Sequence, residues 1–554
     1  MRRRICLIPQ PQKMREADGQ LAVSDLTEIV ASQQRDRDLA VLLSQRLFSG
    51  TGHYLPVVEQ KSGNGRSVVL SSDADLDASE IAEVAQERYE LTVDSDGVVL
   101  QGATPAALSR AVATFKQLLP SDAFRRGGGT TAATIPFVSI EDQPRLRWRG
   151  MMIDTVRHFQ PKAFILDLID QAWLHRMNVV QLHLTDDQGW RIDIPSRPKL
   201  REVSAWRSET VTGHALLEGP GDGTPHGGYY TLDDLREIVA YARQRHITVV
   251  PEINMPGHTR AALAAYPELG LAEKQPVATT FGVFFEVLEP TEETLKFSED
   301  VFAVVTDVFD SPVIHIGGDE VPLEQWEKSS NAAEIMSRHG YDDLRQVQGW
   351  FAQAFGEQLA KHGRRIAGWD EVLGAGAPND TIVTVWRNEG YAVRAADKGY
   401  DAIVAPEPYA YLDHYESEDT NEPLRIHGQT SVGKIEKWDP VPEGLDGSQI
   451  YGAQCQLWAE YLPTPRDVEY ALFPRLAAFS DAAWSEMEVR QADPVSERIA
   501  EGYIERLEAQ GVNHRPLDGP LPWQQGGTGV RRRWDRTYVA MEMDEEKFVY
   551  TADE

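Results

Sequence analysis

The residues best suited to proton transfer lie in His315-Ile-Gly-Gly-Asp-Glu320, which ends a short apolar run. Two glycines ahead of two carboxylates let the backbone bend sharply and leave room for a ligand. Adjacent carboxylates repel each other and are costly to desolvate, so we expect Asp319 or Glu320 to hold a proton at neutral pH, as a general acid must. A solvated acidic loop is the alternative. Asp370-Glu371 and Asp186-Asp187 are competing acidic pairs, and both rank lower because neither follows glycines.

Three tryptophans lie where predicted strands end, namely Trp369, Trp386 and Trp458. Aromatic walls suit sugar rings, which offer C–H surface to the face of an aromatic ring. A single tryptophan at such a place is usually part of the core. Three at equivalent ends of three strands favour a binding wall.

A histidine follows another predicted strand, in Pro256-Gly-His258. It could bridge two carboxylates and tune both, with Asp186 and His183 as candidate neighbours, in a hydrogen-bond relay to Glu320. Histidines and acids can also bind a metal, but no close ligand spacing supports that here. A purely structural histidine is the third interpretation.

Two charged residues could hold hydroxyl groups. Arg157 follows the first predicted strand and Glu460 the last, and a guanidinium and a carboxylate can grip neighbouring hydroxyls by charge-assisted hydrogen bonds. Alone, either is more often a member of a surface ion pair. Gly127-Gly-Gly129 lacks a lysine and a strand–helix context, so it does not indicate a phosphate loop.

The first 140 or so residues are expected to form a small α+β domain. Tyr89–Val93 alternates like a half-buried strand, Asp94–Gly97 is a turn, and Val98–Leu100 returns. Thr104-Pro105 then predicts the start of a helix with Leu108, Val112, Phe115 and Leu119 on one face. The glycine- and threonine-rich stretch 121–134 is expected to be a linker or exposed loop.

From about residue 145, short β-branched runs alternate with helical stretches. The helices are expected near 163–176, 232–245, 344–362, 390–398 and 464–480, and a further helix lies within 494–516. We expect eight strands, at Gly150–Asp154, Val179–Leu184, Ile247–Ile253, Val313–Ile316, Arg365–Ala367, Thr381–Trp386, Ala402–Ala405 and Ile450–Leu457.

Eight strands with intervening helices suggest a (β/α)8 barrel, although a doubly wound sheet fits the alternation nearly as well. Polar and aromatic residues follow nearly every strand, and in a barrel those ends meet around one pocket, whereas a doubly wound sheet would spread them along an edge. This clustering favours the barrel. The expected division is an N-terminal domain at 1–140, the barrel at 141–516, and a tail at 517–554 of unassigned role.

The chain has 554 residues, of which 42% are hydrophobic and 25% charged, with a net charge of −31. That acidity argues against a nucleic-acid binder, which needs a basic face, and disfavours adsorption to anionic lipid. Cys6 and Cys455 are the two cysteines, too few for a disulfide framework or a metal-binding cysteine cluster. The apolar stretch at Ile5–Ile8 is too short for a signal peptide, and no run reaches the length of a membrane helix. We therefore expect a cytoplasmic protein.

The motifs together resemble those of the glycoside hydrolase family 20 β-N-acetylhexosaminidases, over roughly residues 85–515. Their order and number make a chance match very unlikely. The matching blocks are Arg149-Gly150 with Asp154-Thr-Val-Arg157-His-Phe159, His183-Leu-Thr-Asp186-Asp-Gln-Gly-Trp190, Gly228-Tyr-Tyr-Thr231, Pro251-Glu-Ile-Asn-Met-Pro-Gly-His258, His315-Ile-Gly-Gly-Asp-Glu320, Gly368-Trp-Asp-Glu371, Tyr411-Leu-Asp413 and Gln456-Leu-Trp-Ala-Glu460.

The resemblance implies a small α+β domain before a catalytic barrel, and a retaining exo-acting hydrolase that removes terminal β-linked N-acetylglucosamine or N-acetylgalactosamine through an oxazolinium intermediate. Glu320 matches the acid/base, Asp319 the residue that orients the 2-acetamido group, and Tyr411 a donor to the acetamido oxygen. The remaining matches are Trp369, Trp386 and Trp458 as walls, Arg157, Asp413 and Glu460 as hydroxyl-binding residues, and Asp186 and His258 as the relay behind Glu320.

The resemblance implies no cofactor and no metal, and a small-molecule or oligosaccharide partner that ends in an N-acetylhexosamine. Nucleic acid and membrane are not expected partners. The sequence leaves open the preferred sugar, the natural substrate, release of mono- or disaccharides, and the oligomeric state. A sugar-binding barrel without catalysis and a metal-dependent barrel hydrolase are the alternatives.

Overall fold

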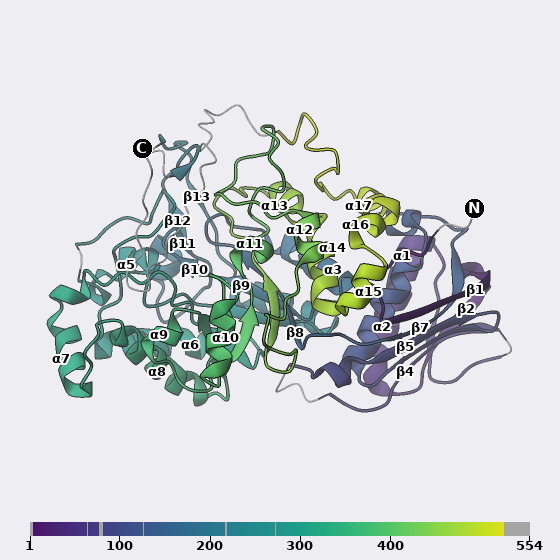
Figure 1. The fold of residues 1–554 in the computed structure, drawn as a ribbon, viewed down its shortest axis with the longest axis horizontal. Helices are drawn as coiled ribbons and strands as arrows, with labels where there is room; N and C mark the ends of the chain where they lie inside the picture. The colour runs from purple at the N-terminus through teal and green to yellow at the C-terminus, as the bar shows by residue number, and fades with distance from the viewer. Residues whose placement is uncertain are drawn as a thin grey trace.

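The computed structural model describes residues 4–63, 65–76, 81–125, 127–215, 219–271 and 273–525. Most of the predicted tail, residues 526–554, therefore lies outside the described residues. Figure 1 shows the strands of the N-terminal sheet, in purple and blue, at one end of the molecule and the parallel strands of a barrel beside them. The two parts carry the fold, and the barrel positions the candidate site.

The N-terminal part is a mixed sheet with two helices. Within the described residues the sheet has seven strands in the order β1-β7-β5-β6-β4-β2-β3. The helices are α1 (Arg37–Thr51) and α2 (Pro105–Gln117). The strands are β1 (Lys13–Ala22), β2 (Leu26–Ala31), β3 (Val57–Val58), β4 (Arg66–Ser72), β5 (Tyr89–Asp94), β6 (Gly97–Gly102) and β7 (Thr134–Asp142).

The predicted hairpin and helix of this part form for the expected reasons. Strands β5 and β6 pair antiparallel from Tyr89 with Gly102 to Asp94 with Gly97, and Gly97 has a φ of +143°, a conformation that favours glycine. The Thr104 side chain accepts a hydrogen bond from the Ala107 N–H and so caps α2. The predicted linker differs, because Ser121–Phe124 forms a short 3-10 helix whose Ala123 and Phe124 are buried.

The second part is a closed barrel of parallel strands, in the spatial order β14-β15-β16-β17-β18-β19-β8-β9. The predicted barrel with a preceding α+β domain is therefore confirmed. The strands are β8 (Trp148–Asp154), β9 (Val179–His183), β14 (Thr248–Glu252), β15 (Val313–His315), β16 (Arg365–Trp369), β17 (Ile382–Val385), β18 (Asp401–Val404) and β19 (Gly452–Cys455).

Helices follow most barrel strands. Two of them begin with reciprocal caps, in which Thr231 pairs with Asp234 and Thr464 with Asp467. The helices are α3 (Lys162–Leu174), α4 (Leu232–Arg243), α5 (Arg260–Ala265), α6 (Glu292–Val308), α7 (Ser330–His339), α8 (Gln346–Ala360), α9 (Val372–Ala375), α10 (Gly390–Asp397), α11 (Glu407–Ala410), α12 (Val432–Lys437), α13 (Pro465–Leu472), α14 (Arg475–Trp484), α15 (Met487–Ala492), α16 (Val495–Arg498) and α17 (Ile504–Gln510). Short strand pairs β10 (Thr185–Asp186) with β11 (Gly189–Trp190), and β12 (Trp206–Arg207) with β13 (His226–Gly227), lie in the loops.

The interior of the barrel changes character along its axis. Near the amino ends of the strands, an apolar cluster fills it with Trp148, Val179, Val313, Ile382 and Tyr451 among its members. At the carboxyl ends, a second cluster consists of Trp369, Trp386 and Tyr411, with Trp458 packed against it. The apolar layer closes one end, so the aromatic and polar groups gather at the other.

A buried ionic network joins the N-terminal part to the barrel. Arg110 of α2 donates from Nε to Glu87 Oε1 at 2.8 Å, and Arg149 of β8 pairs with Glu87 Oε2 at 2.5 Å. The side chains of all three are at most 1% exposed. Arg149, a residue of the family motifs, thus lies at the joint with the N-terminal part rather than at the candidate site.

No helix among the described residues is long and apolar enough to cross a membrane. Neither Cys6 nor Cys455 forms a disulfide within the described part of the chain.

Candidate active site

Every barrel strand contributes a predicted site residue at or after its carboxyl end. Because parallel strands in a barrel all point the same way, these residues surround one end of the molecule. They are Arg157 after β8, Asp186 after β9, His258 after β14, Asp319 and Glu320 after β15, Trp369 at the end of β16, Trp386 after β17, Tyr411 and Asp413 after β18, and Trp458 and Glu460 after β19.

The backbone after β15 turns sharply, as the paired glycines predicted. Gly317 and Gly318 have φ values of +71° and +88°, and Glu320, although it has a side chain, has a φ of +50°. A positive φ is uncommon for residues other than glycine and is maintained only where the surroundings enforce it. The strained backbone directs both carboxylates of Asp319 and Glu320 towards one imidazole.

Within this bend, Gly317 has no room for a side chain. A Cβ built on Gly317 would lie 1.9 Å from Asn254 Oδ1, whereas Gly363, with a φ of +69°, has nothing within 4 Å. We expect Gly317→Ala to be less stable than Gly363→Ala by about 1–3 kcal/mol, because only the first must displace a packed side chain. Turnover should fall only in Gly317→Ala. Urea unfolding and kcat of both variants test this, and equal losses would contradict it.

The imidazole of His258 lies between two pairs of carboxylates. Its Nδ1–H donates to Asp187 Oδ2 at 2.8 Å and lies 3.4 Å from Asp186 Oδ1. Its Nε2 lies 3.5 Å from Asp319 Oδ2 and 3.4 Å from Glu320 Oε2. Burial opposes a charged imidazole, but the surrounding carboxylates outweigh it and hold the pKa of His258 well above its usual value.

Asp319 has a raised pKa. Burial is the main cause and the neighbouring Glu320 carboxylate adds to it, while His258 opposes the shift. Asn254 donates from Nδ2 to Asp319 Oδ1 at 2.8 Å and accepts a hydrogen bond from the Gly318 N–H at 3.1 Å. The orientation of Asp319 is thus fixed by Asn254, which lies just after the neighbouring strand β14.

The aromatic wall is held by carboxylates. Trp369 donates from Nε1 to Glu252 Oε1 at 3.1 Å, and Trp386 donates from Nε1 to the Glu371 carboxylate at 3.2 Å. The ring centroids of Trp369 and Trp458 are 5.7 Å apart. The competing pair Asp370-Glu371 therefore lies in the same site. Asp370 accepts a hydrogen bond from the backbone N–H of Trp386 and forms an ion pair with Arg387.

Arg157 joins the wall to the relay. Its Nη2 lies 2.9 Å from Asp186 Oδ2, and its guanidinium carbon lies 4.9 Å from the centroid of the Trp458 ring. His183 also contacts Asp186 Oδ2, at 2.9 Å from Nε2, and is held on its other side by Glu252. Arg157 is therefore a buried member of a network, not a surface ion pair.

Asp413 and Glu460 are acidic groups with few protein partners. Both carboxylate oxygens of Asp413 are buried and lack a hydrogen-bond partner among the described residues. Burial, strengthened by the nearby Glu460 charge, raises the pKa of Asp413 well above its usual value. Buried polar oxygens without partners are costly, so they mark positions where ligand hydroxyls would bind favourably.

Burial raises the pKa of Glu460 from 4.5 to about 7, with Arg157 opposing the shift. When folding raises the pKa of a carboxyl group, that group stabilises the folded state fully at a pH below its pKa in the unfolded chain. This stabilisation is lost as the pH rises through its pKa in the folded protein. We expect the ligand-free protein to lose stability relative to Glu460→Gln between pH 4.5 and 7. Chemical unfolding of both proteins at pH 4.5, 6 and 8 measures this difference, and parallel pH profiles would contradict it.

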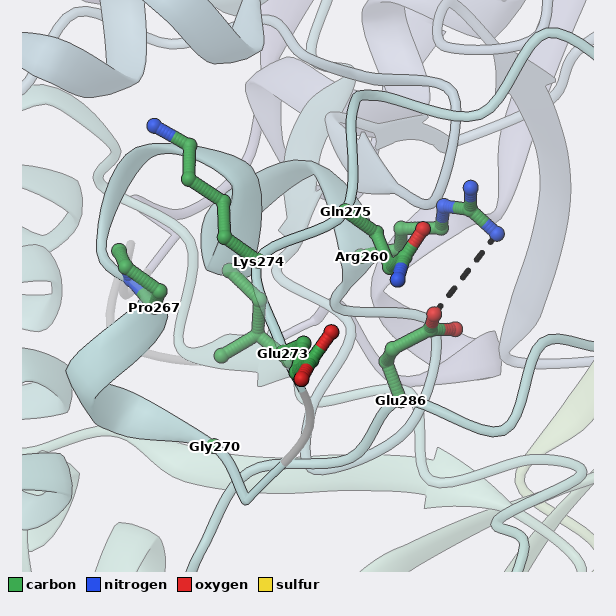
Figure 2. A pocket seen from close by; sticks show the side chains of 8 residues that line it. Arg260, Pro267, Gly270, Glu273, Lys274, Gln275 and Glu286 are labelled. Atoms are coloured by element: carbon green, nitrogen blue, oxygen red, sulfur yellow. Dashed lines mark ion pairs between the residues drawn. The ribbon is translucent and has the colours of Figure 1, made fainter.

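A small cavity lies to the side of this site, near α5 (Figure 2). It contains the ion pair between Arg260 Nη1 and Glu286 Oε1, 3.7 Å apart. None of the predicted site residues lines it. The Arg260 N–H nevertheless donates to Asp187 Oδ1 at 3.0 Å, so the cavity adjoins the back of the relay. Its lining is Arg260, Leu263, Pro267, Gly270, Glu273, Lys274, Gln275 and Glu286.

Two family models match adjacent parts of this chain. The model described as "Glycosyl hydrolase family 20, catalytic domain" matches residues 146–487, and the one described as "Glycosyl hydrolase family 20, domain 2" matches residues 4–143. The first match alone covers more than half of the chain. The chain belongs to glycosyl hydrolase family 20. It is a glycoside hydrolase.

Individual family 20 proteins agree with this assignment. A β-hexosaminidase of Porphyromonas gingivalis is 34% identical over 95% of this chain, which spans 66% of that protein's length. A β-hexosaminidase of Akkermansia muciniphila is 35% identical over 80% of this chain and 87% of the relative. A crystal structure of a family 20 exo-β-N-acetylglucosaminidase from Vibrio harveyi with N-acetylglucosamine has a TM-score of 0.79 and 28% identity, covering 92% of this chain and 78% of the other.

Within this family 20 site, Asp187 is the residue that sequence reasoning ranked too low. We expected Asp186 to be the partner of His258, but Asp187 makes the shorter contact. The adjacent acidic pair is visible in the sequence, but the turn between β10 and β11 decides which of the two carboxylates reaches His258. Asn254, Glu252 and Glu371 were also not assigned, although all three lie in the family motifs or directly beside the catalytic segments.

Two sets of these side chains have the spacing of a metal site. The ligand atoms of Asp186, Asp187 and His258 lie within 4.8 Å of one another, and so do those of His258, Asp319 and Glu320. In both sets the imidazole already has close carboxylate neighbours on both sides. Such contacts suit a proton relay, and the absence of a catalytic metal stays a prediction.

Proposed function

We propose that this protein is a retaining exo-β-N-acetylhexosaminidase that cleaves terminal β-linked N-acetylglucosamine or N-acetylgalactosamine. The observation that carries the proposal is the convergence of Asp319 and Glu320 on His258, 3.5 and 3.4 Å from its Nε2, beside an aromatic wall. Glu371 accepts a hydrogen bond from Trp386 of that wall, and Tyr411 belongs to the wall. Both residues interact electrostatically with Asp319, so the wall and the carboxylates form one site. The relatives named β-hexosaminidase support the same class of reaction.

In the first step, Glu320 protonates the glycosidic oxygen while the substrate's own acetamido oxygen forms a bond to C1. The bond from C1 to the leaving group breaks, and positive charge develops on the cyclised oxazolinium ring. In the second step, Glu320 takes a proton from water, the water oxygen bonds to C1, and the ring opens. Two inversions at C1 give net retention.

Asp319 would bind the acetamido N–H and stabilise the charge that develops there. A carboxylate whose pKa is raised by burial gains more from a nearby positive charge than a solvated one does. Asn254 keeps that carboxylate oriented through its 2.8 Å hydrogen bond. Tyr411 would donate to the acetamido oxygen, and the tryptophans would enclose the methyl group and the sugar ring.

His258 would act as a positioning residue for Glu320. Its Nδ1 is fixed by Asp187 and Asp186, so Nε2 stays directed at the two carboxylates. A charged imidazole there stabilises Glu320 once it has given up its proton. Arg157, Asp413 and Glu460 would bind ring hydroxyls, and the unpartnered oxygens of Asp413 are the strongest support for that part.

The stereochemistry of the product tests the mechanism. The full chain is mixed with an aryl β-N-acetylglucosaminide, and the first anomer released is followed by NMR before mutarotation. We expect β-N-acetylglucosamine first. The α anomer first would contradict retention, and binding of the sugar without hydrolysis would favour the non-catalytic alternative.

Three further expectations remain proposals. We divide the chain at residues 140 and 516, which limited proteolysis tests. The cytoplasmic location stays a prediction, and cell fractionation tests it. Both epimers at C4 are expected substrates, because a guanidinium and a carboxylate, at Arg157 and Glu460, can bind hydroxyls in either orientation.

A further inference from the structure

Three side chains that the proposed reaction does not use lie together after β18. Glu407 begins α11, His414 follows the Tyr411-Leu-Asp413 motif, and His427 comes from the next loop. Glu407 Oε1 lies 3.5 Å from His414 Nε2 and 3.3 Å from His427 Nδ1. One ligand atom from each residue lies within 4.8 Å of the others.

The two separations measured from Glu407 match a tetrahedral metal site. Ligands bound at about 2.0–2.2 Å from a tetrahedral ion lie about 3.3–3.6 Å apart. Two imidazoles and one carboxylate are among the ligand sets that zinc prefers, and the fourth position can hold water. The His427 side chain is 42% exposed, so an ion would reach the cluster from solvent.

The buried imidazole of His414 gives independent support. Its side chain is 2% exposed, and Nε2 has no hydrogen-bond partner among the described residues. Gly428 packs against the other side of the ring, where an added Cβ would lie 2.3 Å from Nδ1. Thr430 Oγ1 lies 3.5 Å from Nδ1 as well. The ring is therefore held with an unsatisfied nitrogen directed at Glu407, which a metal ion would satisfy.

The nearby Lys434 does not occupy this position. Lys434 interacts electrostatically with Glu407, but its Nζ donates to the Gln429 carbonyl at 3.0 Å and lies 5.3 Å from the Tyr409 ring centroid. Among the described residues, the Glu407 carboxylate thus forms no salt bridge to a lysine or an arginine. An ion between the three ligands would offset its buried charge.

We propose that Glu407, His414 and His427 form a binding site for a divalent transition metal of the zinc class. This site shares no ligand with the cluster of His258, Asp319 and Glu320, although Glu407 and His427 both interact electrostatically with Glu320. The inference does not depend on the proposed reaction. Because Tyr411 and Asp413 lie between the ligands Glu407 and His414, a bound ion would stabilise the segment that carries them. The centroids of Tyr411 and His414 are 5.5 Å apart, so the effect would be local.

Calorimetric titration of the full, chelator-treated protein with zinc chloride tests the site. We expect one ion per chain in the wild type, and at least tenfold weaker binding in His427→Gln and Glu407→Gln. His427 is partly exposed, so its variant should fold normally. His339→Gln, at an exposed histidine of α7, is the matched control and should bind as the wild type does.

The competing cluster is tested by Asp319→Asn. Binding that is unchanged in Asp319→Asn and lost in His427→Gln supports the proposal. The opposite pattern, or no binding by the wild type at micromolar zinc, overturns it. Cobalt gives a second readout, since the visible absorption of tetrahedral Co²⁺ should appear in the wild type and disappear in His427→Gln, and an octahedral spectrum in the wild type would also overturn it.

Discussion

Glu320→Gln is expected to lower kcat on N-acetylglucosaminides with poor leaving groups by about 10²–10⁴-fold, the usual contribution of a general acid. Glutamine has nearly the shape of the acid but no proton to give to the glycosidic oxygen. Sugar binding should survive, because Glu320 approaches His258 at 3.4 Å and the wall is formed by other residues. The measurement is kcat together with the dissociation constant of a thiazoline inhibitor.

The leaving group separates this role from a structural one. Activated aryl glycosides need little protonation, so the loss in Glu320→Gln should be much smaller for them at the first step. Glu324→Gln is the matched control, since Glu324 is exposed on the same loop, and it should retain full activity. An equal loss on activated and unactivated substrates would assign Glu320 to folding or binding instead of proton transfer.

The barrel could be predicted from sequence because its physical signals are local. Buried parallel strands require continuous apolar runs, and each run in this chain lies within a few residues of the observed strand. The prediction of Val313–Ile316 is one residue longer than β15, and that of Ile450–Leu457 extends beyond β19 at both ends. The positions of polar groups after each strand followed from the topology alone.

The edge of the N-terminal sheet was not predictable in the same way. Strand β1 (Lys13–Ala22) is mostly exposed and lacks a clear apolar alternation, and it is held by pairing with β7, more than 100 residues later. Such pairing is a non-local property that periodicity does not carry.

The contacts inside the site were also hidden from the sequence. Which of Asp186 and Asp187 reaches His258 depends on a tight turn between β10 and β11. Glu407 and His427 meet because the chain that follows β18 folds back on itself between them. Residue types and strand ends therefore predict which groups gather, while loop conformation decides which atoms touch.

Removing the 2-acetamido group from the substrate is expected to have the largest effect of all. An internal nucleophile held close to C1 contributes roughly 7–11 kcal/mol through proximity. We therefore expect kcat/KM for an aryl β-glucoside to be lower than for the matching N-acetylglucosaminide by a factor of at least about 10⁵. A glucoside can still be protonated by Glu320, but no carboxylate of the site is proposed to attack C1 in place of the missing group. Steady-state rates on the matched pair measure the difference.

Asp319→Asn should reduce the difference in kcat/KM between the two substrates by slowing cleavage of the N-acetylglucosaminide. The variant keeps the hydrogen-bonding shape but loses the charge that stabilises the oxazolinium, and we expect a loss of about 10²–10³-fold on the N-acetylglucosaminide, comparable to removing one electrostatic contact to a transition state. The residual rate on the glucoside should hardly change, because no acetamido group is there to be held. The control is Asp342→Asn, at an exposed aspartate in the loop between α7 and α8. If Asp319→Asn lowered the rates on both substrates equally, Asp319 would act on the sugar ring or on the fold. That result would contradict its proposed role in the substrate-assisted mechanism.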